Sequence, residues 1–342
     1  MKKRTSLKDI AEALGVSVTL VSYVMNNKTK EGRVAPETAQ KIRQTAKELN
    51  YQPNQLARSL KSKRSQTIGL IVADISNPFF ANLARTIEDE AHSLNYTVIF
   101  GSSDENHIKL KKVLDFLTTR QVDGFIIAPT DECKETLIEL KKSQIPFVLI
   151  DRYFEDLPTN YVIIDNFQAS LDATNHLLKK GHEKIGIIHY KSELIHFKQR
   201  VNGYLKALEM SGISPDPKYM QEVTYANFEA DIKAALRNLI YEEEVEAIFF
   251  CTNTLALEGL KQMFDWGIKA PGQMDVVAFD QNVVYDFFNY FIPHIKQPIK
   301  EMGQEAVRIL IGQINEKVPK INTVCLRTTL ETQTIDQLKL KT

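Results

Sequence analysis

Residues 6–27, SLKDIAEALGVSVTLVSYVMNN, predict two short helices joined by a tight turn. The apolar residues of the first helix recur at the spacing of one helix face and are Leu7, Ile10, Ala11 and Leu14. Gly15 follows them, and glycine readily adopts the left-handed conformation that ends a helix. Ser17 is a suitable cap for a second helix, which would bury Val21 and Val24. The stretch therefore predicts a pair of crossing helices.

The exposed face of the second helix is suited to nucleic acid. It carries short or flat side chains, namely Val18, Thr19, Ser22 and Tyr23. Such groups can reach base edges in the major groove of DNA. Helix pairs with apolar stripes also occur as purely structural hairpins, so this interpretation depends on the residues that follow.

A third helix is predicted to begin at Pro36, whose missing N–H costs nothing in a first turn. Its inward stripe comprises Ala39, Ile42, Ala46 and Leu49. Asn50 can adopt the left-handed conformation that ends it. Between the second and third helices, Asn27 and Lys28 belong to a polar loop suited to phosphate contacts. Three short helices with a basic exterior have the size of a DNA-binding head.

The charge is distributed unevenly along the chain. Residues 1–65 carry 14 Lys and Arg against 5 Asp and Glu, whereas the rest of the chain carries 29 against 38. A small basic head on an acidic body indicates a polyanion as the partner of the head. The chain has 342 residues, of which 43% are hydrophobic and 25% charged, so it should form two or three soluble domains.

The segment after the head, residues 51–67, combines cations with apolar residues. Pro53 can open a short helix in which Leu60 is an apolar wedge for a minor-groove step, while the neighbouring cations hold phosphates. So short a helix is unstable alone, and we expect it to fold on the duplex. An ordinary flexible linker is the alternative. The residues assigned to DNA contact here are Ala57, Arg58, Leu60 and Lys61.

From Thr67 onward, strand-like and helix-like segments alternate. The apolar runs are TIGLIVA, YTVIFG, GFIIAP, PFVLI, YVIID, KIGIIHY, EAIFFC and MDVVAF. Near-continuous apolar strands that alternate with amphipathic helices are typical of parallel sheets covered on both faces. About ten strands suit two doubly wound subdomains, in which a ligand binds outside the carboxyl ends of the strands.

Polar and aromatic side chains follow several of these strands. Asp74, Phe79 and Phe80 come after the first strand, and the others are Asp151, Asn253 and Asp280. Because these strand ends converge on one cleft, their carboxylate and amide groups suit a ligand with vicinal hydroxyls. Strand-end aspartates also cap helices, and the phenylalanines could be core residues. Gln297 lies where the chain returns to the first subdomain.

Other classes of protein find less support in the sequence. No apolar run has the length of a membrane span, and the N-terminus lacks the hydrophobic region of a signal peptide, so we expect a cytoplasmic protein. The three cysteines have no metal-ligand spacing, and His196 has no second ligand at such spacing, so no metal or cofactor is expected. Nucleophile-elbow, P-loop and dinucleotide motifs are absent. A solute-binding or carbohydrate-modifying protein on the same body is the alternative, and the basic head argues against it.

The chain resembles the Lac/Gal repressor family of bacterial transcription regulators over essentially its full length. Besides the two-helix stretch, the resemblance rests on VAPETAQKIRQTAKELNYQPNQLARSL, TIGLIVADISNPFF, VDGFIIAP, VIIDN, GHEKIGIIH, QRVNGYLKAL, CTNTLALEGL and AFDQ, in this order and spacing. The resemblance implies a helix-turn-helix head, a hinge helix and a periplasmic-binding-protein-like effector domain. It also implies a homodimer, with a tetramer left open, that binds a pseudo-palindromic operator.

The resemblance assigns roles to particular residues. Val18, Thr19 and Tyr23 match base readers, Leu60 matches the leucine that opens the central operator step, and Ala57 packs beside it. The residues expected at DNA are Leu7, Ser17, Val18, Thr19, Ser22, Tyr23, Asn27, Lys28, Ala57, Arg58, Leu60 and Lys61. Arg200 matches a ligand-clamping arginine and Phe228 an aromatic of the far lobe. The residues expected at a sugar or related effector are Asp74, Phe79, Phe80, Asp151, Arg200, Phe228, Asn253, Asp280 and Gln297.

These assignments divide the chain and leave some questions open. The expected domains are residues 1–52, a hinge at 53–66, and a body at 67–342. Within the body, we expect a first subdomain of about 67–165 plus 296–322 and a second of about 166–292 plus 323–342. Thr254 and Leu194 depart from the family pattern, so a phosphorylated or acidic effector stays open, as does control by a partner protein.

Overall fold

The structure of the chain is a computed structural model that describes residues 5–51, 64–270, 272–287, 291–315 and 321–332. The chain divides into two compact units, a head within residues 1–65 and a body within residues 66–342. The residues of the expected hinge contact, Ala57, Arg58, Leu60 and Lys61, lie outside the described ranges. The hinge helix therefore stays a prediction.

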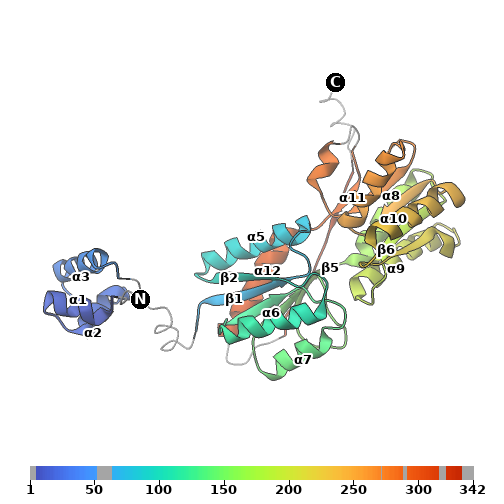
Figure 1. The fold of residues 1–342 in the computed structure, drawn as a ribbon. Coiled ribbons are helices and arrows are strands. Elements are labelled where there is room, and N and C mark those ends of the chain that lie inside the picture. The colour runs from blue at the N-terminus through green and yellow to red at the C-terminus, as the bar shows by residue number, and fades with distance from the viewer. Residues whose placement is uncertain (1–4, 52–63, 271, 288–290, 316–320, 333–342) are drawn as a thin grey trace. The chain divides into compact units, whose positions relative to one another are not determined.

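The head is a bundle of three short helices around one small core (Figure 1). The helices are α1 (Leu7–Leu14), α2 (Val18–Met25) and α3 (Pro36–Glu48). Ser6 and Asp9 form a capping box at the start of α1, and Gly15, with a φ of 65°, ends it. The Ser17 hydroxyl caps α2 by accepting a hydrogen bond from the Leu20 N–H at 3.1 Å. The core residues are Ile10, Ala11, Val21, Val24, Ala39, Ile42 and Ala46. The three predicted helices are confirmed, but Leu49, which we expected in the inward stripe of α3, is exposed at the end of this helix.

The first lobe of the body is built on a parallel sheet with the strand order β11-β5-β4-β3-β1-β2. Its strands are β1 (Thr67–Val72), β2 (Thr97–Ser102), β3 (Gly124–Ile127), β4 (Phe147–Ile150), β5 (Asn160–Ile164) and β11 (Thr323–Leu326). Helices α5 (Pro78–Ser93) and α12 (Ile299–Asn315) cover one face, and α6 (His107–Thr119) and α7 (Lys134–Lys142) cover the other (Figure 1).

The second lobe repeats this plan with the strand order β12-β10-β9-β8-β6-β7, except that the edge strand β12 is antiparallel to β10. Its strands are β6 (Ile185–Tyr190), β7 (Met220–Val223), β8 (Ala247–Phe250), β9 (Asp275–Phe279), β10 (His294–Lys296) and β12 (Thr329–Glu331). The helices on one face are α8 (Asn166–Lys179) and α9 (Ile195–Met210), and those on the other are α10 (Phe228–Arg237) and α11 (Asn253–Asp265). Short turns of 3-10 or π-helix occupy Pro217–Tyr219, Asn238–Glu242 and Val283–Phe287.

Burial on both faces explains why the central strands are apolar throughout. Leu70 and Val72 pack with α5 and α12, whereas Ile71 between them packs with α6 and α7. Strands in this position have no solvent face on which a polar residue would be favourable. The predicted class, a helical head and a body of two doubly wound subdomains, is confirmed. Across the described ranges, every helix is too short or too polar to span a bilayer.

The strands that differ from the prediction are short, and all except β10 lie at a sheet edge. The eight apolar runs form β1–β6, β8 and β9. The structure adds four strands that we did not predict, namely β7, β10, β11 and β12. We assigned residues 323–342 to the second subdomain, and this is wrong for β11. Thr323–Leu326 pair with Tyr161–Ile164 of β5 and so extend the first sheet. An edge strand is held mainly by backbone hydrogen bonds, and this one has no apolar run to mark it.

Candidate functional site

The exposed face of α2 carries most of the residues expected at DNA in the head. Val18 is 45% exposed, and Thr19 beside it is exposed too. The side chain of Ser22 is engaged by the Asn26 amide, which donates to its hydroxyl at 3.3 Å and to its carbonyl at 2.8 Å. Tyr23 is half-buried and lies against Gly32. The helix therefore presents an accessible face, with Tyr23 fixed by packing.

The remaining expected contacts of the head differ in character. Leu7 is half-buried and packs on the core of the head, so its side chain stabilises α1 instead of facing outward. Asn27, with a φ of 59°, accepts a hydrogen bond from Arg43 at 3.2 Å. Lys28 forms an exposed ion pair with Glu31 at 2.9 Å. An exposed pair of this kind is weak, and the lysine can exchange it for a phosphate.

The body contains a cleft of about 770 Å³ at the carboxyl ends of strands from both lobes. Its walls include every body residue that we expected at an effector, namely Asp74, Phe79, Phe80, Asp151, Arg200, Phe228, Asn253, Asp280 and Gln297. They come from segments that follow β1, β4, β6, β7, β8, β9 and β10. The strands of each lobe thus bring residues that are distant in sequence to one cavity.

Arg200 lies at the bottom of the cleft, surrounded by groups that hold it in place. Its Nε donates to Asn166 Oδ1 at 2.8 Å, a terminal nitrogen donates to the Cys251 carbonyl at 2.6 Å, and its guanidinium lies 3.5 Å from the centre of the Phe279 ring. Gly203, one turn later in α9, lets this helix approach α8 closely, because a Cβ there would meet the Phe167 carbonyl oxygen. Arg200 is therefore a rigid, buried cation.

Two buried carboxyl groups lie near Arg200. Burial raises the pKa of Asp280 to about 6, against the attraction of Arg200 and a 2.5 Å hydrogen bond from the Gln297 amide. Burial also raises the pKa of Asp151, again against nearby arginines. Conversely, burial lowers the pKa of Arg200, while Asp280 and Asp151 oppose this change. The bottom of the cleft is thus a compensated cluster of charges.

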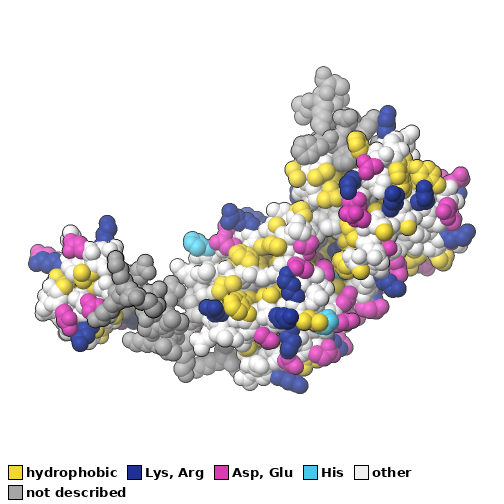
Figure 2. Space-filling view, in the orientation of Figure 1, with side chains coloured by type: hydrophobic (Ala, Val, Ile, Leu, Met, Phe, Trp, Pro, Cys, Tyr) yellow, Lys and Arg dark blue, Asp and Glu magenta, His cyan; other side chains and the backbone are white. Residues whose placement is uncertain are grey.

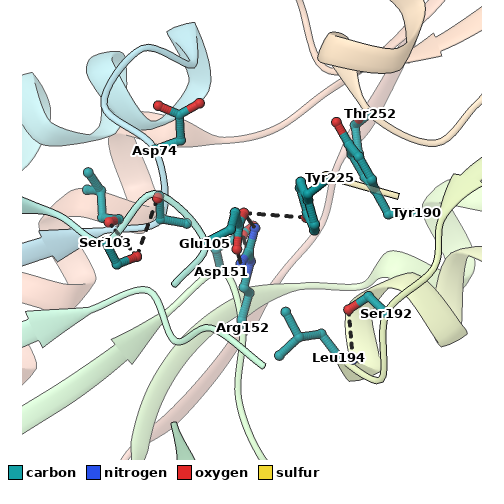
Figure 3. Close-up of polar contacts among 12 residues, drawn as sticks. Asp74, Ser103, Glu105, Asp151, Arg152, Tyr190, Ser192, Leu194, Tyr225 and Thr252 are labelled. Atoms are coloured by element: carbon teal, nitrogen blue, oxygen red, sulfur yellow. Dashed lines mark hydrogen bonds and ion pairs between the residues drawn. The ribbon is translucent and has the colours of Figure 1, made fainter. Parts of the chain in front are cut away.

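Glu105 and Arg152 form an ion pair in the wall that we did not predict. The two terminal nitrogens of Arg152 donate to the two carboxylate oxygens of Glu105, both at 2.7 Å. Burial lowers the pKa of Arg152, but Glu105, together with Tyr225 and Asp151, opposes this change, and the pKa lies above its ordinary value. Figure 3 shows that Tyr225, from the second lobe, points at the same carboxylate, with its hydroxyl 3.4 Å away.

Aromatic rings line opposite sides of the cleft. Tyr190 and Tyr225 of the second lobe stack with centroids 4.2 Å apart and an interplanar angle of 13°, and Phe228 continues the stack. Phe79 and Phe80 of the first lobe meet edge to face at 4.9 Å. Flat apolar walls of this kind can hold the faces of a ring whose edge carries polar groups.

Several buried polar atoms of the wall have no hydrogen-bond partner within the described part of the chain. They are Asn253 Oδ1, Gln297 Oε1 and His196 Nδ1. Asn253 donates through its amide to Asn77 Oδ1 at 2.9 Å. Burial lowers the pKa of His196 well below its ordinary value, so its ring is neutral. Buried groups without partners are costly in a folded protein, and a ligand with hydroxyl groups would satisfy them.

The two departures from the family pattern have structural explanations. The Thr254 hydroxyl lies 3.0 Å from the Tyr190 hydroxyl and 2.9 Å from that of Thr252, so it fixes the aromatic stack. Leu194 is buried in the second core and precedes α9. Asp74 is partly occupied as well, because it accepts hydrogen bonds from the Ser76 N–H and hydroxyl. Thr254 therefore lines the cavity without adding charge, whereas Leu194 belongs to the core of the second lobe and not to the lining.

Two protein-family models match this chain, one over the head and one over the body. A family model described as "Bacterial regulatory proteins, lacI family" matches residues 6–54, and one described as "Periplasmic binding proteins and sugar binding domain of LacI family" matches residues 65–334. Catabolite control protein A of Priestia megaterium is 33% identical over 313 residues, which cover 91% of this chain and 93% of that protein.

Solved structures of bacterial regulators have a fold similar to that of this chain. A lac repressor dimer bound to operator and the anti-inducer ONPF has a TM-score of 0.83 at 22% identity and covers 96% of this chain and 98% of its own. A LacI family transcriptional regulator from Enterococcus faecium with bound ribose has a TM-score of 0.68 at 26% identity, covering 78% of this chain and 97% of its own. The first similarity supports the fold of the whole chain. The second is to a regulator whose structure contains bound ribose.

Proposed function

Because the chain belongs to the LacI family of bacterial regulatory proteins, we propose that it is a dimeric transcriptional repressor controlled by a small molecule. The head binds a pseudo-palindromic operator, and a sugar or sugar derivative binds in the cleft of the body. As a member of this family the chain is a regulator and not an enzyme. The observation that carries the proposal is the cleft, in which aromatic walls surround buried carboxyl and amide groups.

A sugar matches the chemistry of this cleft. Asn253 Oδ1 and Gln297 Oε1, which have no partner among the described residues, can accept from ligand hydroxyls, and Asp151 and Asp280 add carboxylate oxygens. Each hydroxyl of a sugar both donates and accepts, so it can bridge such acceptors and the Arg200 guanidinium. The stacked rings of Tyr190 and Tyr225 supply an apolar face of suitable size. The related regulator from Enterococcus faecium has ribose bound.

Dimer formation is supported by the edge of the first sheet. β2 is the edge strand, and Ile99 and Phe100 on it are exposed, as is Ile75 nearby. Figure 2 shows hydrophobic side chains over β2 and α5 on this lobe. An exposed, apolar edge strand is unfavourable in a monomer. A second copy on this edge would bury it and would supply a second head for the second half-site.

The contribution of the DNA contacts follows from their chemistry. The α2 face lacks the arginine and glutamine side chains that read guanine or adenine through two hydrogen bonds. Much of the affinity therefore comes from phosphates and from bending of the operator. We assign the bending to Leu60 and Ala57, with Arg58 and Lys61 on the phosphates. The effector acts by linkage, changing operator affinity by about 5- to 150-fold, typical of coupling energies of about 1–3 kcal/mol.

The proposal is tested on the purified full-length chain in two steps. Selection from a pool of random duplexes should yield a pseudo-palindromic sequence, bound more tightly than scrambled DNA. A thermal-shift screen of uncharged sugars should then find one that raises Tm, since a ligand at 100 times its Kd adds about 2.7 kcal/mol of stability. The sugar must also change operator affinity. Failure to select any sequence contradicts the DNA assignment, and a response only to a partner protein contradicts the sugar assignment.

A further inference from the structure

The cleft holds few cations, and two of them, Arg152 and Lys261, are already paired with acids. The cations in its walls are Arg152, Arg200 and Lys261, and the acids are Asp74, Asp104, Glu105, Asp151, Glu258 and Asp280. Lys261 is paired at the rim with Glu258 of the same helix at 3.1 Å. An anionic ligand would therefore enter a wall in which carboxylates outnumber cations.

Arg152 would be the natural anion-binding group of the wall if it were free. It is only 4% exposed, and its guanidinium lies 5.6 Å from the centre of the Phe80 ring. Glu105 occupies both terminal nitrogens, the Pro129 carbonyl takes a further hydrogen bond at 3.2 Å, and Asp151 accepts from Nε at 3.3 Å. A bidentate carboxylate has the same geometry on arginine as a phosphate would have. Glu105 therefore takes the place of a ligand anion.

At the start of three helices near the cleft, a side-chain oxygen of the protein accepts a hydrogen bond from a first-turn N–H. Asn77 accepts from the Phe79 N–H at 3.0 Å at the start of α5, and Thr252 accepts from the Leu255 N–H at 3.2 Å at the start of α11. Asn106 caps α6 in the same way. These first-turn N–H groups would otherwise be donors for a phosphate. Each cap thus removes one first-turn N–H that a phosphate could otherwise have used.

We propose that Glu105 is a specificity-determining residue that neutralises Arg152 and restricts the effector to uncharged sugars. Phosphate esters and acids of the same sugars are excluded, since their charge would meet a wall in which carboxylates outnumber cations and in which Glu105 already occupies Arg152. This inference rests on the proposed function, because it takes the cleft as the effector site. A phosphorylated or acidic effector, which the departures at Leu194 and Thr254 left open, is therefore among the excluded ligands.

The first test uses the unaltered full-length chain and paired probes. Isothermal titration with ribose and ribose 5-phosphate, and with glucose and glucose 6-phosphate, compares each sugar with its ester. For every sugar that binds, we expect the ester to bind at least tenfold more weakly. An ester that binds more tightly than its parent overturns the inference but leaves the proposed function intact. If every sugar and ester fails to bind, the proposed function itself is contradicted.

The second test removes the charge that holds Arg152. Glu105→Gln keeps the shape of the side chain and should raise affinity for the phosphate ester or inorganic phosphate at least tenfold. Glu105→Gln combined with Arg152→Ala should lose this gain, because the gain depends on the released guanidinium. Glu139→Gln, on the exposed outer side of α7, changes the net charge equally and should leave anion affinity unchanged. Equal anion affinity in Glu105→Gln and the unaltered chain contradicts the assignment of Glu105.

Discussion

Two residues at strand ends, Asp151 and Asp280, share an unusual backbone conformation. Their φ angles are 69° and 71°, in the left-handed region that residues other than glycine seldom adopt, and both side chains are buried. Strain of this kind persists where the surrounding structure fixes it, often at ligand sites. Their position after apolar strands made both residues predictable. Glu105 and Arg152 were not predictable in this way, because 47 residues separate them and only the folded sheet brings them together.

The raised pKa of Asp280 predicts a pH dependence of stability. Its folded pKa of about 6 lies above the ordinary value of 3.8, so the folded protein binds the proton more strongly than the unfolded chain. Asp280 therefore favours folding least above about pH 6, and its effect becomes more favourable as the pH falls toward 4. Asp280→Asn has no charge to bury. The difference in Tm, variant minus unaltered chain, should rise between about pH 4 and pH 6 and then level off.

A matched substitution separates this effect from general titration. The pKa of Asp231 is lowered below its ordinary value by hydrogen bonds from the Thr224 hydroxyl and N–H, so it shifts in the opposite direction to that of Asp280. The same difference for Asp231→Asn should therefore be flat between pH 4 and pH 8. Thermal unfolding at half-unit pH steps measures both variants. A flat curve for Asp280→Asn as well would show that its carboxyl is not held in the desolvated state described here.

Gly32 predicts how the base-reading face of the head is held. A Cβ at this position would lie 2.6 Å from Cγ of the Tyr23 ring, so Gly32→Ala must displace that ring. Because Tyr23 is a proposed base reader, specific binding should weaken by about 1–3 kcal/mol, the range for one lost base contact. Fluorescence anisotropy with the selected operator and a scrambled duplex measures the effect. Gly312→Ala in α12, where a Cβ meets nothing within 4 Å, is the control. Equal loss on both duplexes would argue against base reading by Tyr23.

At the scale of elements, the connections between the lobes are the informative feature. Within the described ranges the chain passes between lobes after β5, after β10 and between β11 and β12. The first crossing was predictable, since it follows a buried strand and precedes an amphipathic helix. The second was placed correctly at Gln297, although β10 before it was not predicted. The third was misplaced because β11, with the sequence TVCL, alternates exposed and half-buried residues and has no core to mark its sheet. Long buried elements are thus encoded locally, whereas edge strands depend on their partners.

The edge strand β2 carries a prediction about assembly. Phe100 is 47% exposed on β2 and belongs to a depression of about 570 Å³ between β2 and α5. A charge in a dimer interface is strongly unfavourable, so Phe100→Glu should weaken dimer formation by about 2 kcal/mol or more, the scale of an interface hot spot. Sedimentation velocity over a range of concentrations measures this. Phe116→Glu on α6, at the opposite face of the same sheet and 55% exposed, should leave the dimer intact. The interface lies elsewhere if Phe100→Glu has the dimer affinity of the unaltered chain.

At the scale of the whole molecule, the two lobes of the body are linked across the cleft by side chains. The hydrogen bonds across it join Asn253 to Asn77 at 2.9 Å, Tyr225 to Glu105 at 3.4 Å and Ser192 to Asp131 at 2.8 Å. Each joins a residue of one lobe to a residue of the other, so opening or closing of the lobes changes them. A ligand that contacts both lobes binds one arrangement better than another, and it shifts the population by that difference in affinity.

Arg200 is the residue at which this coupling can be separated from DNA binding. It is buried in the second lobe and has no part in the head, so its loss should abolish the effector response while operator affinity without effector stays within about twofold. Removing a buried cation beside two carboxyls can destabilise the fold by several kcal/mol. Arg200→Lys therefore accompanies Arg200→Ala, since lysine keeps the charge but loses the planar contacts with Asn166 and Phe279.

Operator titrations with and without the sugar found in the screen measure both quantities for each variant. We expect sugar affinity to fall at least 100-fold in Arg200→Lys, because a single ammonium cannot replace the paired donors that Arg200 presents. The change in operator affinity produced by the sugar should vanish at concentrations that saturate the unaltered chain. By linkage, the sugar should then also bind free and operator-bound protein equally. A normal response in Arg200→Lys would remove Arg200 from the effector site and transfer the coupling to the Glu105–Tyr225 side of the cleft.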